Sequence, residues 1–338
     1  MTTPLEFLPG IWRLPIPLHV RSEPVNVWIL RDPDGALTLF DTGIHAGAAE
    51  LWPAALEAIG HVPSDVQRLV VSHHHPDHLG GTRALHELTG APVFASAATI
   101  AKAPRVWGDA GRMETYFAEL QLLLDWHGFP ADVAAALGDE AAVAKLAVQL
   151  APPDAWTELE PGAEIETRGH TWEVIPTPGH ADGHIALHAP ASGLLLAADH
   201  LLERISPAVG LFPHHDPDPL GSYIDSLERV AQLDVSTVLP GHGAPFAGAR
   251  ERLRFLVDHH VERIDQCVAV VRATGGATAY EVARSVFSRV FERAVLDAPN
   301  QRFATTESLA HLERARAAGV LEQRQDEDGI TRYIAIDA

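Results

Sequence analysis

Residues 72–81 of this 338-residue chain read SHHHPDHLGG. Within positions 73–78, four histidines and Asp77 crowd around a single proline. Neutral imidazole and carboxylate are the ligands that zinc prefers in proteins, and they also suit iron or manganese. The stretch follows VQRLVVS (66–72), a short apolar run with β-branched residues that predicts a buried strand. A metal centre at the end of a strand is therefore the first hypothesis.

The spacing inside this stretch allows two metals. His73, His75, Asp77 and His78 form the pattern H-x-H-x-D-H. Alternate residues of an extended segment point the same way, so His73 and His75 can share one metal while Asp77 and His78 turn to another. Two metals about 3.5–4 Å apart form the usual dinuclear hydrolase arrangement.

Three other segments offer the additional ligands that two metals need. His180 lies in TPGHADGH (177–184), Asp199 ends the apolar run LLLAAD (194–199), and His242 lies in LPGHG (239–243). A carboxylate at the end of a buried strand is costly without a partner, which makes Asp199 a candidate ligand. Each candidate follows a predicted strand, as a site at one edge of a sheet requires.

These motifs, in this order, resemble the metallo-β-lactamase-fold hydrolases. FDTG (40–43) also matches an early strand and turn of that family, and the resemblance extends over about residues 10–245. It implies an α/β fold, a four-layer αββα sandwich with the metals at one edge.

The resemblance also implies the ligand sets. The first metal would take His73, His75 and His180, the second Asp77, His78 and His242, with Asp199 bridging the two. A hydroxide between the metals would attack an electrophilic carbon or phosphorus, and Asp77 would orient it or move its proton. Two divalent ions are expected, zinc first, with iron or manganese as alternatives.

Other polar residues near these motifs have simpler interpretations. Asp41 is equally a turn residue or an acceptor that orients a ligand histidine. His74 is expected to point away from the metals, and His184 to support its loop rather than bind metal. His200 could contact substrate or nothing. His214 and His215 are expected in a solvated loop, with lining of the pocket as the alternative.

The order of predicted elements suggests one large domain and an appendage. Strands are expected at 25–30, 36–43, 91–96, 163–175, 177–190, 193–202 and 235–243, with helices at 46–59, 82–88 and 218–233. Residues 97–150 are Ala- and Leu-rich and predict a helical insertion, either a lid over the site or a packing element. The catalytic domain is expected to occupy 1–250.

Residues 251–338 predict a second, smaller domain. A long helix from 250 to 274 precedes a helix capped by Thr278 and another capped by Thr305 or Thr306. The sequence VLEQRQDEDGITRYIAI (320–336) then predicts a hairpin with an Asp-Gly turn. This order is typical of a winged helix, and the resemblance includes a subgroup with such an appendage.

The composition limits which kinds of partner and which cell compartment are expected. The net charge is −20, and Lys102 and Lys145 are the only lysines, so a broad nucleic-acid footprint is not expected. Cys267 is the only cysteine, so no intrachain disulfide is possible. The first residues do not resemble a signal peptide, and no apolar stretch is long enough to cross a membrane. A cytoplasmic protein is expected.

The favoured function is a dinuclear-metal hydrolase of a small, hydrophobic ester, thioester or lactone, with a homodimer left open. One alternative is a nuclease or phosphodiesterase, which requires a basic groove. Another is a DNA-binding regulator, which predicts a steep salt dependence. The near absence of lysine disfavours the first and the acidic balance of charge disfavours the second, and the acidic wing, Asp326–Asp328, is poorly suited to bind phosphates. A glutathione thioester is also disfavoured, because the sequence shows no basic cluster to bind it.

Overall fold

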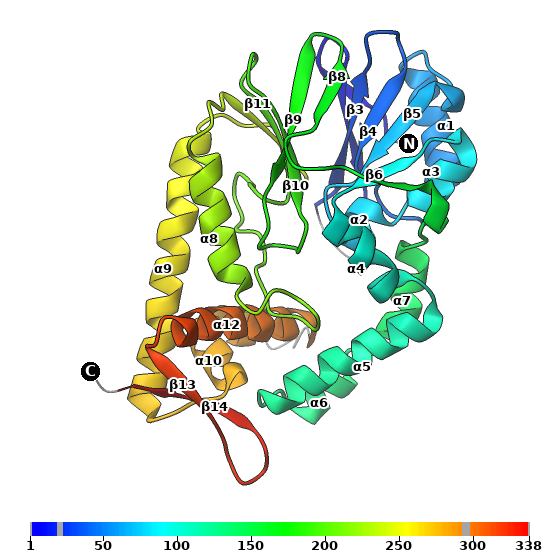
Figure 1. Cartoon of the computed structure of the whole chain (residues 1–338). Coiled ribbons are helices and arrows are strands. Elements are labelled where there is room, and N and C mark those ends of the chain that lie inside the picture. The colour runs from blue at the N-terminus through cyan, green and yellow to red at the C-terminus, as the bar shows by residue number, and fades with distance from the viewer. Residues whose placement is uncertain (1, 19–22, 293–297, 337–338) are drawn as a thin grey trace.

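Two β-sheets lie face to face, and helices cover their outer faces (Figure 1). The computed structural model describes residues 2–18, 23–292 and 298–336. The first sheet contains, in order, β1 (Leu5–Leu8), β2 (Ile11–Ile16), β3 (Val25–Arg31), β4 (Leu37–Phe40), β5 (Val66–Val70), β6 (Val93–Ala95) and β7 (Trp156–Glu158). The second has the order β12 (Thr237–Pro240), β11 (Leu194–Ala198), β10 (Ile185–Ala189), β9 (His170–Pro176) and β8 (Glu164–Thr167).

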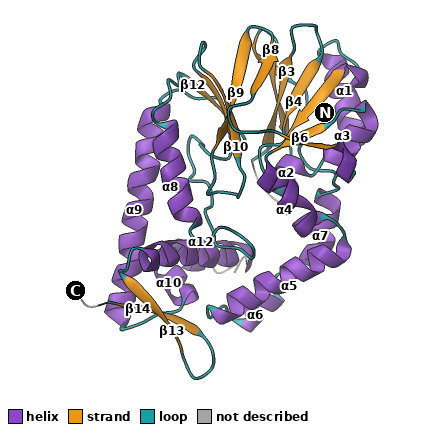
Figure 2. Ribbon diagram, in the orientation of Figure 1, coloured by secondary structure: helices purple, strands orange, loops and turns teal. Residues whose placement is uncertain are grey.

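Apolar side chains fill the three spaces between neighbouring layers of the sandwich and form a core in each. One lies under α1 (Ala48–Ala58) and α3 (Thr82–Thr89) on the outer face of the first sheet, and a second lies between the sheets. A third packs the second sheet against α8 (Pro219–Val230) and the start of α9 (Ala249–Thr274). In β11, Leu195 faces the helices while Leu196 faces the other sheet, as strand alternation requires. The predicted αββα sandwich is confirmed (Figure 2).

The strand directions bring distant segments to one edge. Strands β4, β5 and β6 run parallel in the first sheet, and β11 and β12 run parallel in the second. The carboxyl ends of parallel strands meet at the same edge. Short segments that follow β4, β5, β11 and β12 are therefore placed close together between the sheets. The one-turn helix α2 (Pro76–Leu79) lies at this edge.

The predicted insertion is helical. It contains α4 (Ala97–Trp107), α5 (Ala110–Trp126), α6 (Ala131–Ala135) and α7 (Glu140–Ala147). The chain then passes through two short elements, the 3-10 turn η2 (Pro153–Ala155) and β7, whose three residues gave no strand pattern. A similar turn, η1 (Pro63–Asp65), precedes β5. The strand predicted from residue 177 begins only at Ile185, because residues 177–184 form a loop.

The C-terminal portion has helices followed by a hairpin, in the expected order. After α9 come α10 (Ala279–Val286), α11 (Ser288–Glu292), α12 (Ala298–Ala317), β13 (Leu321–Gln325) and β14 (Thr331–Ala335). The first part of α9 packs on α8, and its last part packs in a separate core with α10 and α12. One continuous helix thus serves both portions. Among the described residues, the structure has no helix with both the length and the apolar character needed to cross a membrane.

One predicted helix cap is correct and one is wrong. The Thr278 hydroxyl accepts a bond from the Glu281 backbone N–H at 3.2 Å, and the Glu281 carboxylate accepts one from the Thr278 N–H, which together form a capping box. Helix α12 begins at Ala298, so Thr305 and Thr306 lie buried in its interior. The Thr305 hydroxyl donates to the Gln301 carbonyl at 2.8 Å, which satisfies it without a cap.

Candidate functional site

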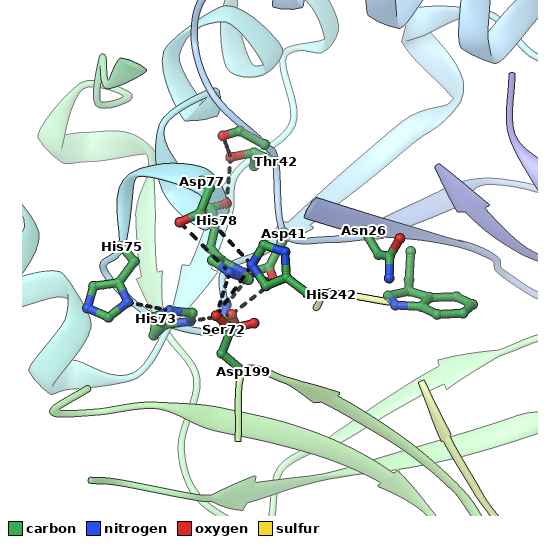
Figure 3. A network of polar contacts seen from close by, with 12 residues as sticks. Asn26, Asp41, Thr42, Ser72, His73, His75, Asp77, His78, Asp199 and His242 are labelled. Atoms are coloured by element: carbon green, nitrogen blue, oxygen red, sulfur yellow. Dashed lines mark hydrogen bonds and ion pairs between the residues drawn. The ribbon is translucent and has the colours of Figure 1, made fainter. Parts of the chain in front are cut away.

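The first two predicted ligands, His73 and His75, follow β5 directly. His75 has φ −72° and ψ 149°, and Pro76 then starts the short helix α2. His73 Nε2 and His75 Nδ1 approach to 3.0 Å, so the alternate side chains converge on one point (Figure 3). His180, from the loop between β9 and β10, completes this group, with all three ligand atoms within 4.8 Å of one another.

The second group forms around the turn of α2. Asp77 and His78 lie on α2, and His242 reaches them from the loop after β12. His242 Nε2 lies 3.3 Å from Asp77 Oδ2, and His78 Nε2 lies 4.0 Å from Asp77 Oδ1. These three ligand atoms also lie within 4.8 Å of one another.

Asp199 lies between the two groups. Its Oδ2 atom is 3.5 Å from Nε2 of His78, 3.5 Å from Nε2 of His242 and 3.7 Å from Nε2 of His180. One carboxylate oxygen thus faces imidazoles of both groups. All seven side chains predicted as ligands are gathered in one place.

Hydrogen bonds on the outer side aim the imidazoles inward. Nδ1 of His180 donates to the Ala208 carbonyl at 2.7 Å, and Nδ1 of His242 donates to the Pro24 carbonyl at 3.0 Å. Nδ1 of His78 lies 2.7 Å from the Asp41 carboxylate. In each case the other ring nitrogen, Nε2, is left facing the centre, which is how protein ligands are commonly oriented toward a metal.

A bound cation would satisfy polar atoms that the protein leaves without partners. Nε2 of His78, His180 and His242 and Oδ1 of Asp199 are buried without a hydrogen-bond partner in the described parts of the chain. The closest carboxylate oxygens, at 3.3 Å or more, lie beyond good hydrogen-bond length. Five imidazoles and two carboxylates are a suitable donor set for divalent zinc, iron or manganese.

The charges around the centre also favour cations. Burial alone would lower the pKa of His242, but the Asp199 and Asp77 carboxylates outweigh it and raise the pKa to about 10. Burial would likewise raise the pKa of Asp77, yet the imidazoles of His78 and His242 hold it below its ordinary value. By contrast, burial and then the neighbouring imidazoles lower the pKa of His73. Positive charge is therefore stabilised around Asp77 and Asp199.

Asp41 orients His78 and is more than a turn residue. Its buried carboxylate accepts bonds from the Ser72 backbone N–H (2.8 Å) and the Ser72 hydroxyl (3.0 Å) as well as facing His78. Because Ser72 donates to Asp41, its oxygen can accept from His73 Nδ1 at 2.9 Å. Asp41 has φ +71°, and Ala198, next to Asp199, has φ +42°. Left-handed backbone at two non-glycine residues of one site marks it as functionally constrained.

The His242 loop depends on residues that sequence analysis missed. The side chain of Asn26 donates to the carbonyls of Pro240 (3.0 Å) and Gly243 (2.8 Å). A Cβ on Gly241 would collide with Asp199 Oδ1, so only glycine fits there. A polar Asn inside the apolar run VNVWIL was the signal in the sequence, since a buried amide needs partners.

The remaining histidines divide between support and core. His184 meets the Thr177 hydroxyl at 2.7 Å and supports its loop as expected. His74 and His200 are buried, and the His200 ring packs against Tyr223. His214 is exposed, but the prediction of a solvated His215 is wrong: its side chain is 1% exposed and packs 5.6 Å from the His74 ring. This burial depends on contacts between loops, which local pattern does not reveal.

A family model described as "Metallo-beta-lactamase superfamily" matches residues 20–242. The chain belongs to this superfamily. A second model, "Metallo-beta-lactamase-like, C-terminal domain", matches residues 265–336. The predicted family and hydrolase activity are thereby confirmed, and the chain is a metallo-hydrolase.

Relatives of similar length support the metallo-β-lactamase assignment. The chain is 27% identical to "Probable metallo-hydrolase YqjP" of Bacillus subtilis, over 95% of this chain and 93% of that protein. It is also 27% identical to a hydroxyacylglutathione hydrolase of Pseudomonas aeruginosa, over 82% of this chain and 86% of that one.

Solved structures agree over nearly the whole chain. A metallo-beta-lactamase family protein from Thermus thermophilus has a TM-score of 0.83 and 31% identity, over 98% of this chain and 100% of that one. A beta-lactamase domain protein from Burkholderia ambifaria has a TM-score of 0.82 and 28% identity, over 98% and 93%. The insertion and the C-terminal portion are thus included in the similarity.

Proposed function

We propose that the chain is a dinuclear-metal hydrolase that cleaves a small, hydrophobic ester, thioester or lactone. The first ion would be held by His73, His75 and His180, and the second by Asp77, His78 and His242, with Asp199 shared. Zinc is the proposed ion at both positions, since imidazole and carboxylate are its common nitrogen and oxygen ligands.

The position of Asp199 carries the dinuclear proposal. Its Oδ2 atom lies at nearly equal distances, 3.5 to 3.7 Å, from His180 of the first group and from His78 and His242 of the second. A single ion in the second group would leave His180 Nε2 buried without a partner among the described residues. Two ions, with Asp199 available as a ligand to each, would satisfy His180 in the first group and His78 and His242 in the second.

The residues divide the chemical work. When bound, the two ions would act as Lewis acids and lower the pKa of water to about 7. Asp77 has the more exposed of the two carboxylates, 15% against 9% for Asp199, and its pKa is held low by His78 and His242 once they outweigh the opposing effect of burial. A carboxylate that stays ionised beside the centre is suited to accept a hydrogen bond from a water there and so to orient that water.

The proposed substrate class rests on the surroundings of the site and on one relative. The Trp107 indole donates to the His74 carbonyl at 2.7 Å, and its ring lies near Tyr116 and Phe117. Trp107 and Tyr116 are buried in the apolar core, so the insertion packs an apolar cluster against the segment 73–78. Lys102, on α4 of this insertion, is neutralised by Asp182 at 2.6 Å. Lys102 is therefore not free to bind an anionic substrate, which favours an uncharged acyl group. The hydroxyacylglutathione hydrolase named above acts, by its name, on an acyl thioester.

The C-terminal portion supports the acyl substrate over nucleic acid. Arg314 and Arg316 on α12 are engaged by Asp218 and Glu313, each at 2.8 Å. Most of α12 is buried against neighbouring helices. A helix so packed does not present the free basic face that DNA or RNA recognition needs.

A substrate panel tests the proposal. Zinc- and manganese-loaded protein would be assayed with aryl and acyl thioesters, esters, lactones, a phosphodiester, single-stranded RNA and a β-lactam. Turnover is expected for one of the acyl substrates, and Asp77→Ala is expected to lower kcat/KM at least about 100-fold, the usual scale for loss of a group that positions a reactant. Circular dichroism checks that the variant folds. Cleavage of RNA or the phosphodiester alone would overturn the acyl assignment.

A further inference from the structure

An ion pair outside the proposed ligand set, with a buried lysine and a partly exposed carboxylate, joins the insertion to the loop of His180. Lys102, on α4, is 6% exposed, and its Nζ lies 2.6 Å from Asp182 Oδ2 and 3.2 Å from the His214 carbonyl. Asp182 follows His180 by two residues in the loop 177–184. Burying an ammonium is costly unless it is paired and hydrogen-bonded, so these contacts hold Lys102 in one place.

The second oxygen of Asp182 reaches a third segment. Oδ1 accepts a bond from the Asp216 backbone N–H at 3.3 Å and lies 3.6 Å from His215 Nδ1. The Asp182 carboxylate therefore ties together α4, the His180 loop and the loop that precedes α8. This third segment also contains the Ala208 carbonyl that accepts from His180 Nδ1.

The start of α4 also contacts the His180 loop directly. Ser96, which caps α4, donates its hydroxyl to the Gly183 carbonyl at 2.6 Å, and the Thr99 hydroxyl lies 3.3 Å from the same oxygen. Gly183 has φ +71°, and a Cβ there would lie 2.7 Å from that of Ala98. The loop thus fits against the first turn of α4 with no space for a side chain.

We propose that Lys102 is a positioning residue for His180. Through its ion pair with Asp182, the insertion helix holds the His180 loop so that Nε2 faces the proposed metal centre. This inference rests on the proposed function only in taking His180 as a metal ligand. We call the Lys102–Asp182 pair the clamp. His73 and His75 follow β5 directly, and His78 and His242 are held by the Asp41 carboxylate and the Pro24 carbonyl. Loss of the clamp is therefore expected to affect His180, and with it the first metal site, more than the second.

A purely structural ion pair would behave differently. It would lower the stability of the fold and leave the affinities of the two metal sites unchanged relative to each other. The Arg68–Asp32 pair is a matched control. Its atoms are also 2.6 Å apart and Asp32 is nearly buried, but the pair joins the middle of β5 to the β3–β4 turn, away from the proposed metal centre.

The test is zinc binding by the full chain, measured by competition with a chromophoric chelator. Lys102→Met is expected to weaken one of two zinc sites about 10- to 100-fold, the usual effect of losing an outer-layer support, and to change the other less than about 3-fold. Asp182→Asn should match it, Lys102→Arg should restore most of the affinity, and Arg68→Met should leave both sites as in the wild type. Unchanged binding in Lys102→Met, or equal weakening of both sites, would overturn the proposal.

Hydrogen exchange separates this inference from the dinuclear proposal. If the wild-type chain binds fewer than two zinc ions, the dinuclear function fails, but the clamp is still tested by exchange of amides in residues 177–184. Faster exchange in Lys102→Met than in Arg68→Met supports the clamp. Equal exchange in the two variants contradicts it.

Discussion

At the scale of single residues, the proposed centre depends on hydrogen bonds made on the far side of each imidazole. Asp41 shows the principle most fully, because one carboxylate holds Ser72 through two bonds and His78 through a third. Its φ of +71° is a cost of about 1–3 kcal/mol that the surrounding contacts offset. Strain of this kind persists where the position of a side chain matters.

Asp41→Asn is expected to weaken zinc binding at the site of His78 by about 10- to 100-fold, because the amide is a poorer acceptor for His78 Nδ1–H. Asparagine tolerates the left-handed backbone, so the fold should survive. Chelator competition measures the affinity. Asp32→Asn serves as the control, since Asp32 is a buried carboxylate remote from the site that holds Thr38 and Arg68. Identical zinc affinities in the two variants would contradict the role assigned to Asp41.

At the scale of elements, the sequence was most informative where a ligand follows a strand directly. The apolar runs before His73, Asp199 and His242 predicted strands, and parallel pairing at one edge brings the residues after them together. His180 was identified by its Pro-Gly turn and by resemblance. The range 177–190 was nevertheless predicted as strand, although the Pro and Gly residues of TPGHADGH are typical of a loop and the apolar run begins only at Ile185.

Features that depend on contacts between elements were not predictable. The burial of His215 and the Lys102–Asp182 pair arise where α4 meets two loops, and neither loop has a periodic pattern. Thr305 resembles a helix cap in sequence, yet α12 starts a full turn or more earlier and the hydroxyl bonds within the helix. The burial of His215 and the Lys102–Asp182 pair thus depend on tertiary contacts, and the cap signal at Thr305 is overridden by a helix that begins earlier.

At the scale of the whole molecule, the insertion connects the metal edge to the C-terminal portion. Helix α4 holds the His180 loop, and the segment after α5 docks on the other portion (Figure 1). The His127 carbonyl accepts from the Tyr280 N–H at 3.2 Å, and the His127 ring stacks on Tyr333. The two family models, 20–242 and 265–336, support our proposal that the chain divides into two domains near residue 250. The insertion bridges them.

The contact that His127 makes with the C-terminal portion should stabilise the fold less as the pH falls. Burial lowers the pKa of His127 to about 4, although nearby Glu313 opposes the shift. Between about pH 6.5 and 4 the unfolded chain binds more protons at this site than the folded chain does, so His127 costs stability as pH falls through that window. His127→Phe removes this pH-dependent loss of stability, because phenylalanine has no group that takes up a proton. From about pH 7 to pH 5, the wild type should lose about 1–2 kcal/mol more unfolding free energy than the variant in urea titrations. Parallel losses in the two proteins would contradict a histidine held neutral by burial.

The most direct test of the central claim is the number of zinc ions bound per chain, measured by elemental analysis after dialysis. Two ions are predicted for the wild type. His180→Ala and His242→Ala are each predicted to retain one, because they remove a ligand from different groups. A single ion in the wild type, or loss of both ions in either variant, would contradict a centre made of two separately held metals.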